Sequence, residues 1–188
     1  LELTVQADEK NLRQFRVDTV KMIPDVGMEK YYTGERDKYY YRKIKYQFYG
    51  KHYHKKVLSE RIFVHQDSLY SKLQSFSTQR QLANLDIFKF VNINYDTTDG
   101  KFIANIFASP LENYSWSNEA GVSVTQGFPG PYYSVSFKRR NLLRGLEILE
   151  LNGRFGFEGV ASATQQNDFY KSTEANLNGS ITFPRFLL

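Results

Sequence analysis

Polar and apolar residues alternate through much of the last third of the chain. Between residues 149 and 158 one set of alternate positions is apolar or glycine, namely Leu149, Leu151, Gly153, Phe155 and Phe157. The interleaved set is mostly charged or polar, namely Glu150, Asn152, Arg154, Gly156 and Glu158. Because successive residues of a β-strand point to opposite sides of the sheet, this pattern predicts a strand with one apolar and one polar face.

Similar two-faced runs occur near residues 114–125, 133–138 and 171–184. Four such strands in succession are typical of a membrane β-barrel wall, which has lipid on one side and water on the other. The longer runs reach the roughly 9–11 residues that a transmembrane strand needs. Aromatic residues near strand ends fit interfacial girdles, namely Tyr114, Trp116, Phe183 and Phe186. A soluble sandwich of antiparallel strands also alternates, although its strands are usually shorter, and it stays the alternative.

The alternation also assigns side chains to faces. We expect lipid contact at Leu151, Phe155, Phe157, Leu177, Ile181 and Phe183. We expect the opposite, water-facing surface to carry Glu150, Asn152, Arg154, Asn176 and Asn178.

The first 110 residues follow a different pattern. Residues 15–23 alternate like a strand that Pro24 to Gly27 interrupts, and Tyr39 to His54 predicts a hairpin turning near Gly50-Lys51. Short helical spacing near Val57–Ile62 precedes a longer amphipathic helix from about Tyr70 to Leu85. Two strands, 87–95 and 102–108, flank an Asp-Gly turn. The predicted unit is α+β, with two helices packed on one sheet.

The core of this unit is expected to come from apolar residues that share a strand or helix face. They are Phe15, Val17, Val20, Ile62, Leu69, Leu73, Phe76, Leu82, Phe90, Ile93, Phe102 and Ile106.

Composition limits the possible classes of protein. The 188 residues contain no apolar run near 18 residues, so a transmembrane helix is not expected, whereas a barrel escapes that test because every second residue is polar. The chain has no cysteine, which excludes disulfides and thiolate metal sites. It starts at Leu1 with neither an initiator methionine nor a signal peptide, so we expect it to be part of a longer protein.

Motifs for catalysis are missing from the sequence. It contains no G-x-S-x-G, phosphate-binding loop or H-E-x-x-H, and we expect neither an enzyme nor a cofactor. Glu150, Glu158 and Glu174 could serve a hydrolytic barrel, but carboxylates are ordinary in a barrel lumen. His52 and His54 share a strand face, yet two imidazoles without a carboxylate make a poor metal site.

A basic and aromatic stretch runs from Lys38 to Lys56. It holds seven lysines or arginines among seven aromatic residues, which could form a platform for single-stranded nucleic acid. A solvated hairpin with an aromatic packing face is the commoner reading of such a stretch. Contact with anionic lipid headgroups or with an acidic partner is a further reading that agrees with the net charge of +5. We expect no nucleic-acid partner.

Several segments together resemble a known family. They are Asp67-Ser68-Leu69-Tyr70-Ser71, the run from Gln81 to Ile93, Arg140-Asn141-Leu142-Leu143-Arg144-Gly145, and Ser180 to Phe186. Their order and spacing over residues 13–188 resemble the last POTRA domain and first barrel strands of the BamA/TamA superfamily of outer-membrane assembly factors. Two positions depart from it, because Asp67-Ser68 and Asp86 stand where glycines are usual. The tyrosine-rich insert and the Leu-Tyr-Ser sequence resemble the TamA-like branch, including its lipoprotein form TamL.

The resemblance implies a domain organisation. Residues 1–12 would end a preceding POTRA unit, 13–110 would form the membrane-proximal POTRA domain with the order β-α-α-β-β, and 111–188 would be the first four strands of an antiparallel transmembrane β-barrel of about sixteen. Residues 126–131 and 161–168 would be extracellular loops, and 139–145 a periplasmic turn. The protein would lie in the outer membrane of a Gram-negative bacterium, with its N-terminal domain in the periplasm.

The resemblance also implies function and partners. Such a factor receives unfolded outer-membrane protein clients through its POTRA domain and inserts them through a lateral gate at the first barrel strand. Its partners would be those clients, outer-membrane lipid, and a periplasm-spanning TamB-like protein or an accessory lipoprotein. Two alternatives stay open: a two-partner-type exporter that conducts clients past the luminal Glu119, Glu150, Arg154 and Glu174, and a soluble β-rich binding module.

Two edge strands are the candidate sites. The gate strand comprises Tyr114, Ser115, Trp116, Ser117, Asn118, Glu119, Ala120, Gly121, Val122, Ser123 and Val124. Its small and polar residues offer little side-chain interlock, which would weaken a seam, or they simply face a crowded lumen. The POTRA edge strand comprises Ile87, Phe88, Lys89, Phe90, Val91, Asn92, Ile93 and Asn94, where Phe88, Phe90 and Val91 are expected in the core.

Overall fold

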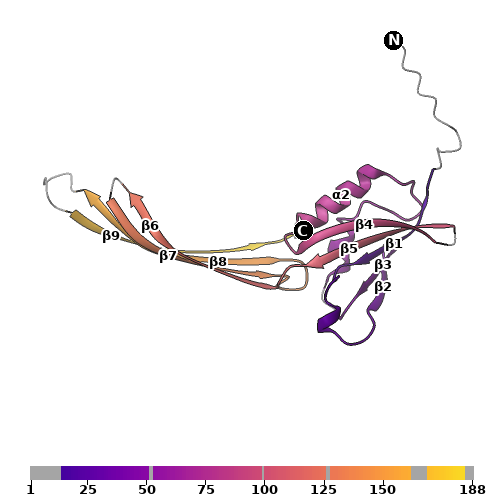
Figure 1. Ribbon diagram of the computed structural model, residues 1–188, viewed down its shortest axis with the longest axis horizontal. Coiled ribbons are helices and arrows are strands. Elements are labelled where there is room, and N and C mark those ends of the chain that lie inside the picture. The colour runs from indigo at the N-terminus through magenta and orange to yellow at the C-terminus, as the bar shows by residue number, and fades with distance from the viewer. Residues whose placement is uncertain (1–13, 51–52, 99, 126–127, 162–168, 185–188) are drawn as a thin grey trace, which may run out of the picture. The chain divides into compact units, whose positions relative to one another are not determined.

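A computed structural model describes residues 14–50, 53–98, 100–125, 128–161 and 169–184 of the chain. The predicted end of a preceding domain, residues 1–12, lies outside the described residues. The chain divides after Leu111 into an N-terminal unit and a C-terminal sheet, which are described separately. Both are built mostly of β-strands with few helices (Figure 1). Among the described residues, no helix is both long and apolar enough to cross a membrane.

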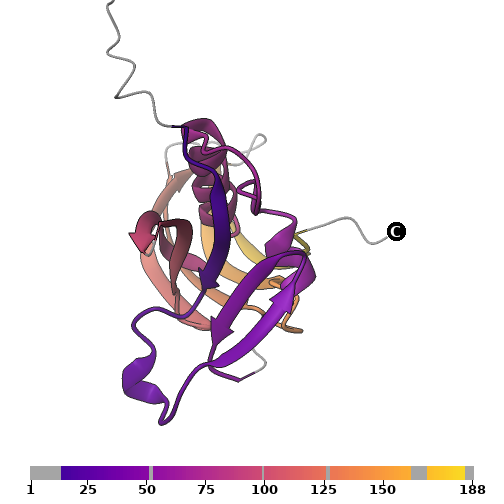
Figure 2. The same ribbon diagram turned by 90° about the vertical axis from the view of Figure 1, so that its right-hand side faces the viewer.

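The N-terminal unit is built on a five-stranded sheet. Its strands are β1 (Val17–Ile23), β2 (Asp37–Tyr41), β3 (Ile44–Phe48), β4 (Phe88–Thr98) and β5 (Lys101–Pro110), in the spatial order β2-β3-β1-β5-β4. Figure 2 shows β1 between the two hairpins, and it runs parallel to both β3 and β5. The helical segments are η2 (Glu29–Tyr31), α1 (Lys55–Ser59) and α2 (Lys72–Ala83), of which α2 lies along β4.

The β2–β3 hairpin corrects two expectations. It turns at Arg42-Lys43 rather than near Gly50-Lys51, and both turn residues have positive φ, 47° and 59°. Two central residues with positive φ form the tight turn whose twist matches paired strands, and the sequence signals it poorly because neither residue is glycine or asparagine. The hairpin adds two strands beside β1, so the observed order is β-β-β-α-α-β-β rather than the expected β-α-α-β-β.

The core of the unit agrees with the prediction only in part. Val17, Val20, Ile62, Leu82 and Ile106 are at most 2% exposed, and Ile93 and Phe102 are half-buried. The other predicted members are 42–74% exposed, namely Phe15, Leu69, Leu73, Phe76 and Phe90, so their assignment was wrong. The insert supplies residues that were not foreseen, since Ile44, Tyr46 and Phe48 are at most 2% exposed.

Helix α2 explains much of this error, because it turns a polar face to the rest of the unit. Thr78 is fully buried, and its Oγ1 accepts a hydrogen bond of 2.9 Å from the backbone N–H of Phe63. Ser75 is hydrogen-bonded to the hydroxyl of Tyr95, and Gln79 donates to the carbonyl of Val91 at 2.7 Å. Apolar spacing alone therefore pointed to the wrong side of the helix.

Two aspartates occupy positions where the resemblance leads one to expect glycine. Asp67 has a φ of 67° and Asp86 a φ of 51°, both in the left-handed region. Asparagine and aspartate enter this region more readily than other residues with a side chain, because their short polar groups bond locally. The two departures therefore keep the backbone conformation that glycine would serve.

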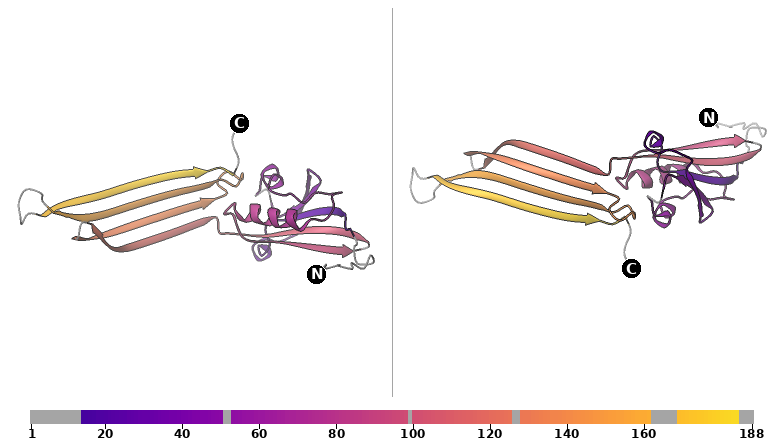
Figure 3. Two further views of the ribbon diagram at one scale, coloured as in Figure 1. Left: turned by 90° about the horizontal axis from the view of Figure 1, so that it is seen from above. Right: turned by 90° about the horizontal axis from the view of Figure 1, so that it is seen from below.

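The C-terminal sheet is open and wholly antiparallel. Its strands are β6 (Tyr114–Thr125), β7 (Phe128–Arg140), β8 (Ile148–Ala161) and β9 (Phe169–Thr182), paired in sequence order (Figure 3). They are 12 to 14 residues long. Strand β7 begins at Phe128, so the loop expected over residues 126–131 is shorter than predicted. Residues 126–127 and 162–168 of the two expected loops lie outside the described residues.

A hydrogen-bonded turn joins β7 to β8. One carboxylate oxygen of Glu147 accepts bonds from the backbone N–H groups of Leu143 and Gly145, at 3.1 and 3.0 Å. The side-chain oxygen of Asn141 accepts from the N–H of Leu146 at 3.1 Å. These bonds hold Leu146 in the left-handed region at a φ of 69°, which is unusual for a bulky side chain.

Candidate functional site

The apolar face of the C-terminal sheet is exposed across all four strands. The pairing places Trp116 opposite Phe137, and Phe137 opposite Leu151. The exposed large apolar residues on this face are Tyr114, Trp116, Val122, Val124, Tyr133, Leu151, Phe155, Phe157, Leu177, Ile181 and Phe183, between 42% and 84% exposed. Monomeric soluble proteins rarely leave such a contiguous apolar surface uncovered.

The register confirms that the two predicted sets lie on opposite faces. Phe155 pairs with Tyr133 and Ala175, whereas its neighbour Arg154 pairs with Ser134 and Asn176. Asn118 is a polar exception on the apolar face, where its side-chain oxygen accepts a 3.1 Å bond from the Tyr133 hydroxyl. Predicted water-facing positions therefore share one surface, which is polar on every strand.

A chain of polar contacts crosses the polar face from β6 to β9. The Tyr132 hydroxyl donates to Oε1 of Glu119 at 2.5 Å, and the Arg154 guanidinium lies 4.3 Å from the centre of the Tyr132 ring. Arg154 Nε is 4.0 Å from a carboxylate oxygen of Glu174. The three contacts of this chain link β6 to β7, β7 to β8 and β8 to β9.

Further polar contacts and a shallow hollow belong to the same face. Lys138 pairs with Glu150 at 2.7 Å, and Ser136 donates to Asn152 at 2.5 Å. The hollow has a volume of about 380 Å³, and its lining includes Ser117, Ser134, Asn176 and Asn178. Of the carboxylates considered for catalysis, Glu150 and Glu174 are engaged by these basic partners, and the side chain of Glu158 lies outside the described residues.

Tyr132 is the residue on this face that sequence reasoning missed. It pairs with Gly121 on β6 and with Gly156 on β8. A Cβ atom added at Gly121 would lie 2.8 Å from Cε1 of the Tyr132 ring, so the ring covers the glycine closely. The absence of a side chain at Gly121 therefore serves packing against Tyr132. A glycine opposite an aromatic residue on the neighbouring strand would have indicated this contact. That signal can be read only once the strand register is known.

The predicted gate strand is one edge of this sheet. All eleven of its residues lie in β6, which pairs with β7 and with no other described strand. On the paired side Ser123 donates to the carbonyl of Gly130 at 3.3 Å. The other side of β6 offers backbone N–H and C=O groups to a further strand.

The predicted edge strand of the N-terminal unit is also an edge. Strand β4 holds Phe88 to Asn94, and Ile87 directly precedes it. Ile87, Phe88 and Val91 are buried, as expected for the latter two, but Phe90 is 49% exposed and its core assignment was wrong. The pairing with β5 shifts between Phe88 and Phe90, which turns Phe90 outward.

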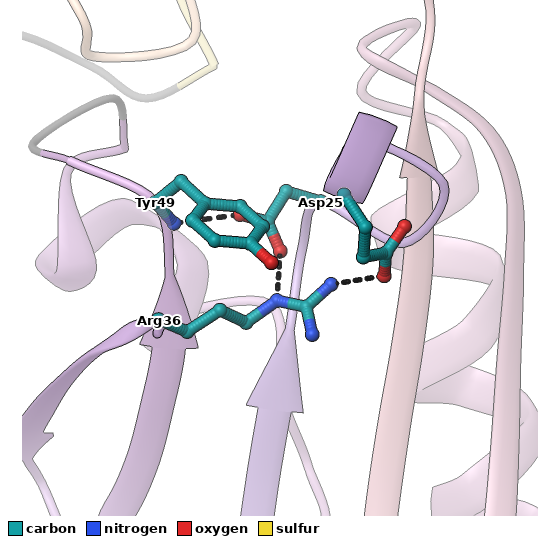
Figure 4. A network of polar contacts seen from close by, with 4 residues as sticks. Asp25, Arg36 and Tyr49 are labelled. Atoms are coloured by element: carbon teal, nitrogen blue, oxygen red, sulfur yellow. Dashed lines mark hydrogen bonds and ion pairs between the residues drawn. The ribbon is translucent and has the colours of Figure 1, made fainter. Parts of the chain in front are cut away.

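A buried polar network fastens the loop between β1 and β2 to the end of β3 (Figure 4). Asp25 is 4% exposed, and its carboxylate accepts bonds from Arg36 Nε at 3.0 Å and from the backbone N–H of Tyr49 at 2.7 Å. The Arg36 guanidinium also pairs with Glu29 and lies 4.9 Å from the centre of the Tyr49 ring. Bonds from its own backbone N–H and from Arg36 hold the pKa of Glu29 below its ordinary value. Every member is bonded to another, so the network is structural.

Metal binding gains no support from the geometry. The described residues contain no group of three or more histidine, cysteine, aspartate or glutamate side chains placed to hold a metal ion. His54 is exposed at the start of α1, and His52 lies outside the described residues.

Comparison with known proteins finds similarity to solved structures only. The chain matches no protein-family model and no curated protein. It is similar to BamA from Haemophilus ducreyi lacking POTRA domains 1–3, at 11% identity over 87% of this chain and 32% of that chain, with a TM-score of 0.39. It is also similar to CdiB from Acinetobacter baumannii, at 11% identity over 74% of this chain and 22% of that chain, with a TM-score of 0.46. The chain thus spans at most a third of either.

Proposed function

We propose that the chain is the start of the barrel and the adjoining periplasmic domain of an outer-membrane protein assembly factor of the BamA/TamA superfamily. The observation that carries the proposal is the C-terminal sheet, whose long strands have one exposed apolar face, one polar face and a free first edge. The finer assignment to the TamA-like branch, with TamL, rests on the tyrosine-rich insert that builds β2 and β3.

Strand length supports a membrane-spanning role. A 13-residue strand is about 43 Å long, since each residue adds about 3.3 Å. Tilted by about 45°, it covers about 30 Å along the membrane normal, which is the thickness of the hydrocarbon core. Because backbone groups cannot stay unpaired in lipid, the open sheet needs further strands to close it.

The proposed mechanism uses the free edge of β6. A client strand would add to β6 through backbone hydrogen bonds, which tolerate many client sequences because side chains are not read. The Tyr132 ring and hydroxyl hold β6 to β7 on its other side, so opening would occur at the outer edge of β6. Strand β4 would receive clients in the periplasm, and a TamB-like protein or an accessory lipoprotein is the further partner expected of this branch.

A lumen-conducting exporter is the second candidate function. The observation that favours it is the polar face, where Glu119, Arg154 and Glu174 form a charged row across the sheet. In that mechanism the client would pass along the row and the seam beside β6 would stay closed. A soluble binding module fits less well, because it would leave the apolar face in water.

A disulfide between β6 and the closing strand of the full-length barrel tests the gate. The described chain has no cysteine, so an introduced pair would react without competition from this part of the protein. We expect oxidation to stop client assembly and reduction to restore it, because a permanently paired edge has no free hydrogen-bonding groups.

A matched lock inside the sheet controls for rigidity. Ser117 and Ser136 are direct partners on β6 and β7, so cysteines there would tie two strands that stay paired in the proposed mechanism. This lock should leave client assembly unchanged. A barrel locked at the outer edge of β6 that still assembles clients at the normal rate would refute the gate and favour the exporter.

A further inference from the structure

One face of the β2-β3-β1 part of the N-terminal sheet carries lysines without acidic neighbours. Lys21 on β1 is the direct partner of Lys45 on β3, and Lys45 is the direct partner of Tyr40 on β2. Lys38 lies two residues before Tyr40 and points to the same side. The alternate residues of these strands, among them Val20, Met22 and Tyr46, are buried on the opposite face. The three ammonium groups and the Tyr40 phenol therefore share one solvent-facing surface, the lysine face.

The described residues do not neutralise this face. None of Lys21, Lys38 and Lys45 has a carboxylate within 4.0 Å among them, and the direct Lys21–Lys45 pairing sets like charges side by side at a cost in stability. Four carboxylates in neighbouring segments have other partners. Asp25 and Glu29 bind Arg36, Asp67 binds Lys43, and Asp37 accepts from the Tyr39 hydroxyl on the other face.

The aromatic residues of the hairpin do not form a stacking platform. Tyr46 and Phe48 are at most 1% exposed, and Phe48 stacks on Tyr39 with ring centres 5.0 Å apart. Lys55 covers Tyr39 from 4.2 Å. Tyr40, at 64% exposed, is the aromatic residue beside the lysines. Binding of single-stranded nucleic acid needs several aromatic side chains on which successive bases stack, and this surface has one exposed tyrosine. Lysines with a single tyrosine fit the headgroup region of a membrane better.

We propose that the lysine face binds the phosphate groups of anionic phospholipids. This inference rests on the proposed function, because only three residues, 111–113, separate β5 from the proposed membrane strand β6. So short a link keeps the N-terminal unit at a high effective concentration of lipid headgroups, so contacts that are weak individually suffice. Lysines near an anionic bilayer surface are attracted to it, and salt screens the attraction.

A single fluorescent label tests the contact in the full chain held in lipid nanodiscs. Gln47 is the direct partner of Lys38 on the lysine face, and cysteine at this position would be the only one in the described chain. We expect a quencher on lipid headgroups to quench the Gln47→Cys label in discs that contain phosphatidylglycerol, but not in discs of phosphatidylcholine alone. High salt should abolish the quenching.

Two triple variants with the same loss of charge separate site from net charge. Lys21→Gln, Lys38→Gln and Lys45→Gln together should weaken the contact by up to about a hundredfold, from the attraction of three charges to an anionic surface. Lys56→Gln, Lys72→Gln and Arg80→Gln remove three exposed charges from α1 and α2 and should leave it unchanged. Equal quenching in both lipids, or equal loss in both variants, would overturn the proposal.

Two further readouts keep the outcomes distinct. A label at Phe155 and an acyl-chain quencher report whether the C-terminal sheet is in the bilayer. If Phe155 is not quenched, the proposed function fails, whereas a quenched Phe155 with an unquenched Gln47 label refutes only the lipid contact. The lysine face could instead bind a polyglutamate peptide and not lipid, with this binding lost in the Lys21, Lys38 and Lys45 variant. That result would also overturn the proposal and assign the face to an acidic protein segment.

Discussion

Removing the Tyr132 hydroxyl should loosen β6 from β7. In Tyr132→Phe the ring still covers Gly121, and the 2.5 Å bond to Glu119 is lost. A hydrogen bond to a charged acceptor contributes about 1.5–3 kcal/mol when it is shielded. Because both groups face water, we expect the loss of stability to fall below this range.

Gly121→Ala should cost more than the loss of that bond. The new Cβ would meet Cε1, Cζ and Oη of Tyr132 at 2.8 to 2.9 Å, well inside the roughly 3.5 Å at which non-bonded atoms rest. The ring must swing away, and it then loses its contacts with both Glu119 and Arg154. Overpacking in a core costs about 1–3 kcal/mol, and because the Tyr132 ring is only half-buried we expect about 1 kcal/mol here.

A double-mutant cycle separates packing from a simple effect of alanine in the strand. In the Tyr132→Ala background the methyl group at Gly121 meets no ring, so Gly121→Ala should be nearly neutral there. The measurement is urea unfolding of the full-length barrel in detergent, together with hydrogen exchange of the β6 amides, which should speed up in Gly121→Ala. If Gly121→Ala costs the same free energy with and without the Tyr132 ring, the reasoning is refuted.

Three further predictions address other parts of the chain. Phe155→Arg, at the middle of β8 on the apolar face, should lower barrel stability in bilayers by about 2–4 kcal/mol, and an unchanged unfolding midpoint would contradict lipid exposure. Thr78→Val should cost about 1–3 kcal/mol in chemical unfolding, because the N–H of Phe63 loses its acceptor, and Thr78→Ser should be milder. The pKa of Glu29 is lower in the folded state than its value near 4.5 in the unfolded state, so the ionised carboxylate stabilises the fold at pH values above 4.5. This stabilisation is lost as the pH falls through the pKa of the folded state. Unfolding followed by near-ultraviolet circular dichroism should show that loss in the parent and not in Glu29→Gln. An equal loss in Glu29→Gln would contradict the role of the Glu29 carboxylate and its bonds from its own backbone N–H and from Arg36.

Strand-like alternation was the part of the sequence that predicted structure best. Residues such as Arg154 and Phe155 lie on opposite faces because the side-chain period of a strand is two, whatever its partners. The two helices were also expected close to where they occur, whereas the turn predicted over residues 96–100 starts too early, because β4 continues to Thr98. These features depend on local preferences, so a single sequence contains them.

Other features depend on partners that a single sequence does not name. Leu73 and Phe76 have helical spacing, yet α2 packs through Ser75, Thr78 and Leu82. The hydrogen-bonding partners of Ser75 and Thr78 lie in other segments of the chain, and Leu82 is fully buried. The packing role of Tyr132 can be recognised only from the strand register, which places Gly121 and Gly156 beside it. Local periodicity cannot distinguish such cases.

The position of β1 affects the order in which the N-terminal unit can fold during synthesis. Strand β1 lies in the middle of the sheet, and its partner β5 begins at Lys101, almost eighty residues further along the chain. Parallel pairing over such a separation closes slowly, because the loop entropy is lost before the contacts form. A chain that emerges from its N-terminus can pair β1 only with the β3 hairpin, and it leaves Val20 and Met22 partly uncovered until β5 arrives. We expect this interval to be when the chain depends most on chaperones, and the early β1–β3 pairing to be what limits aggregation during it.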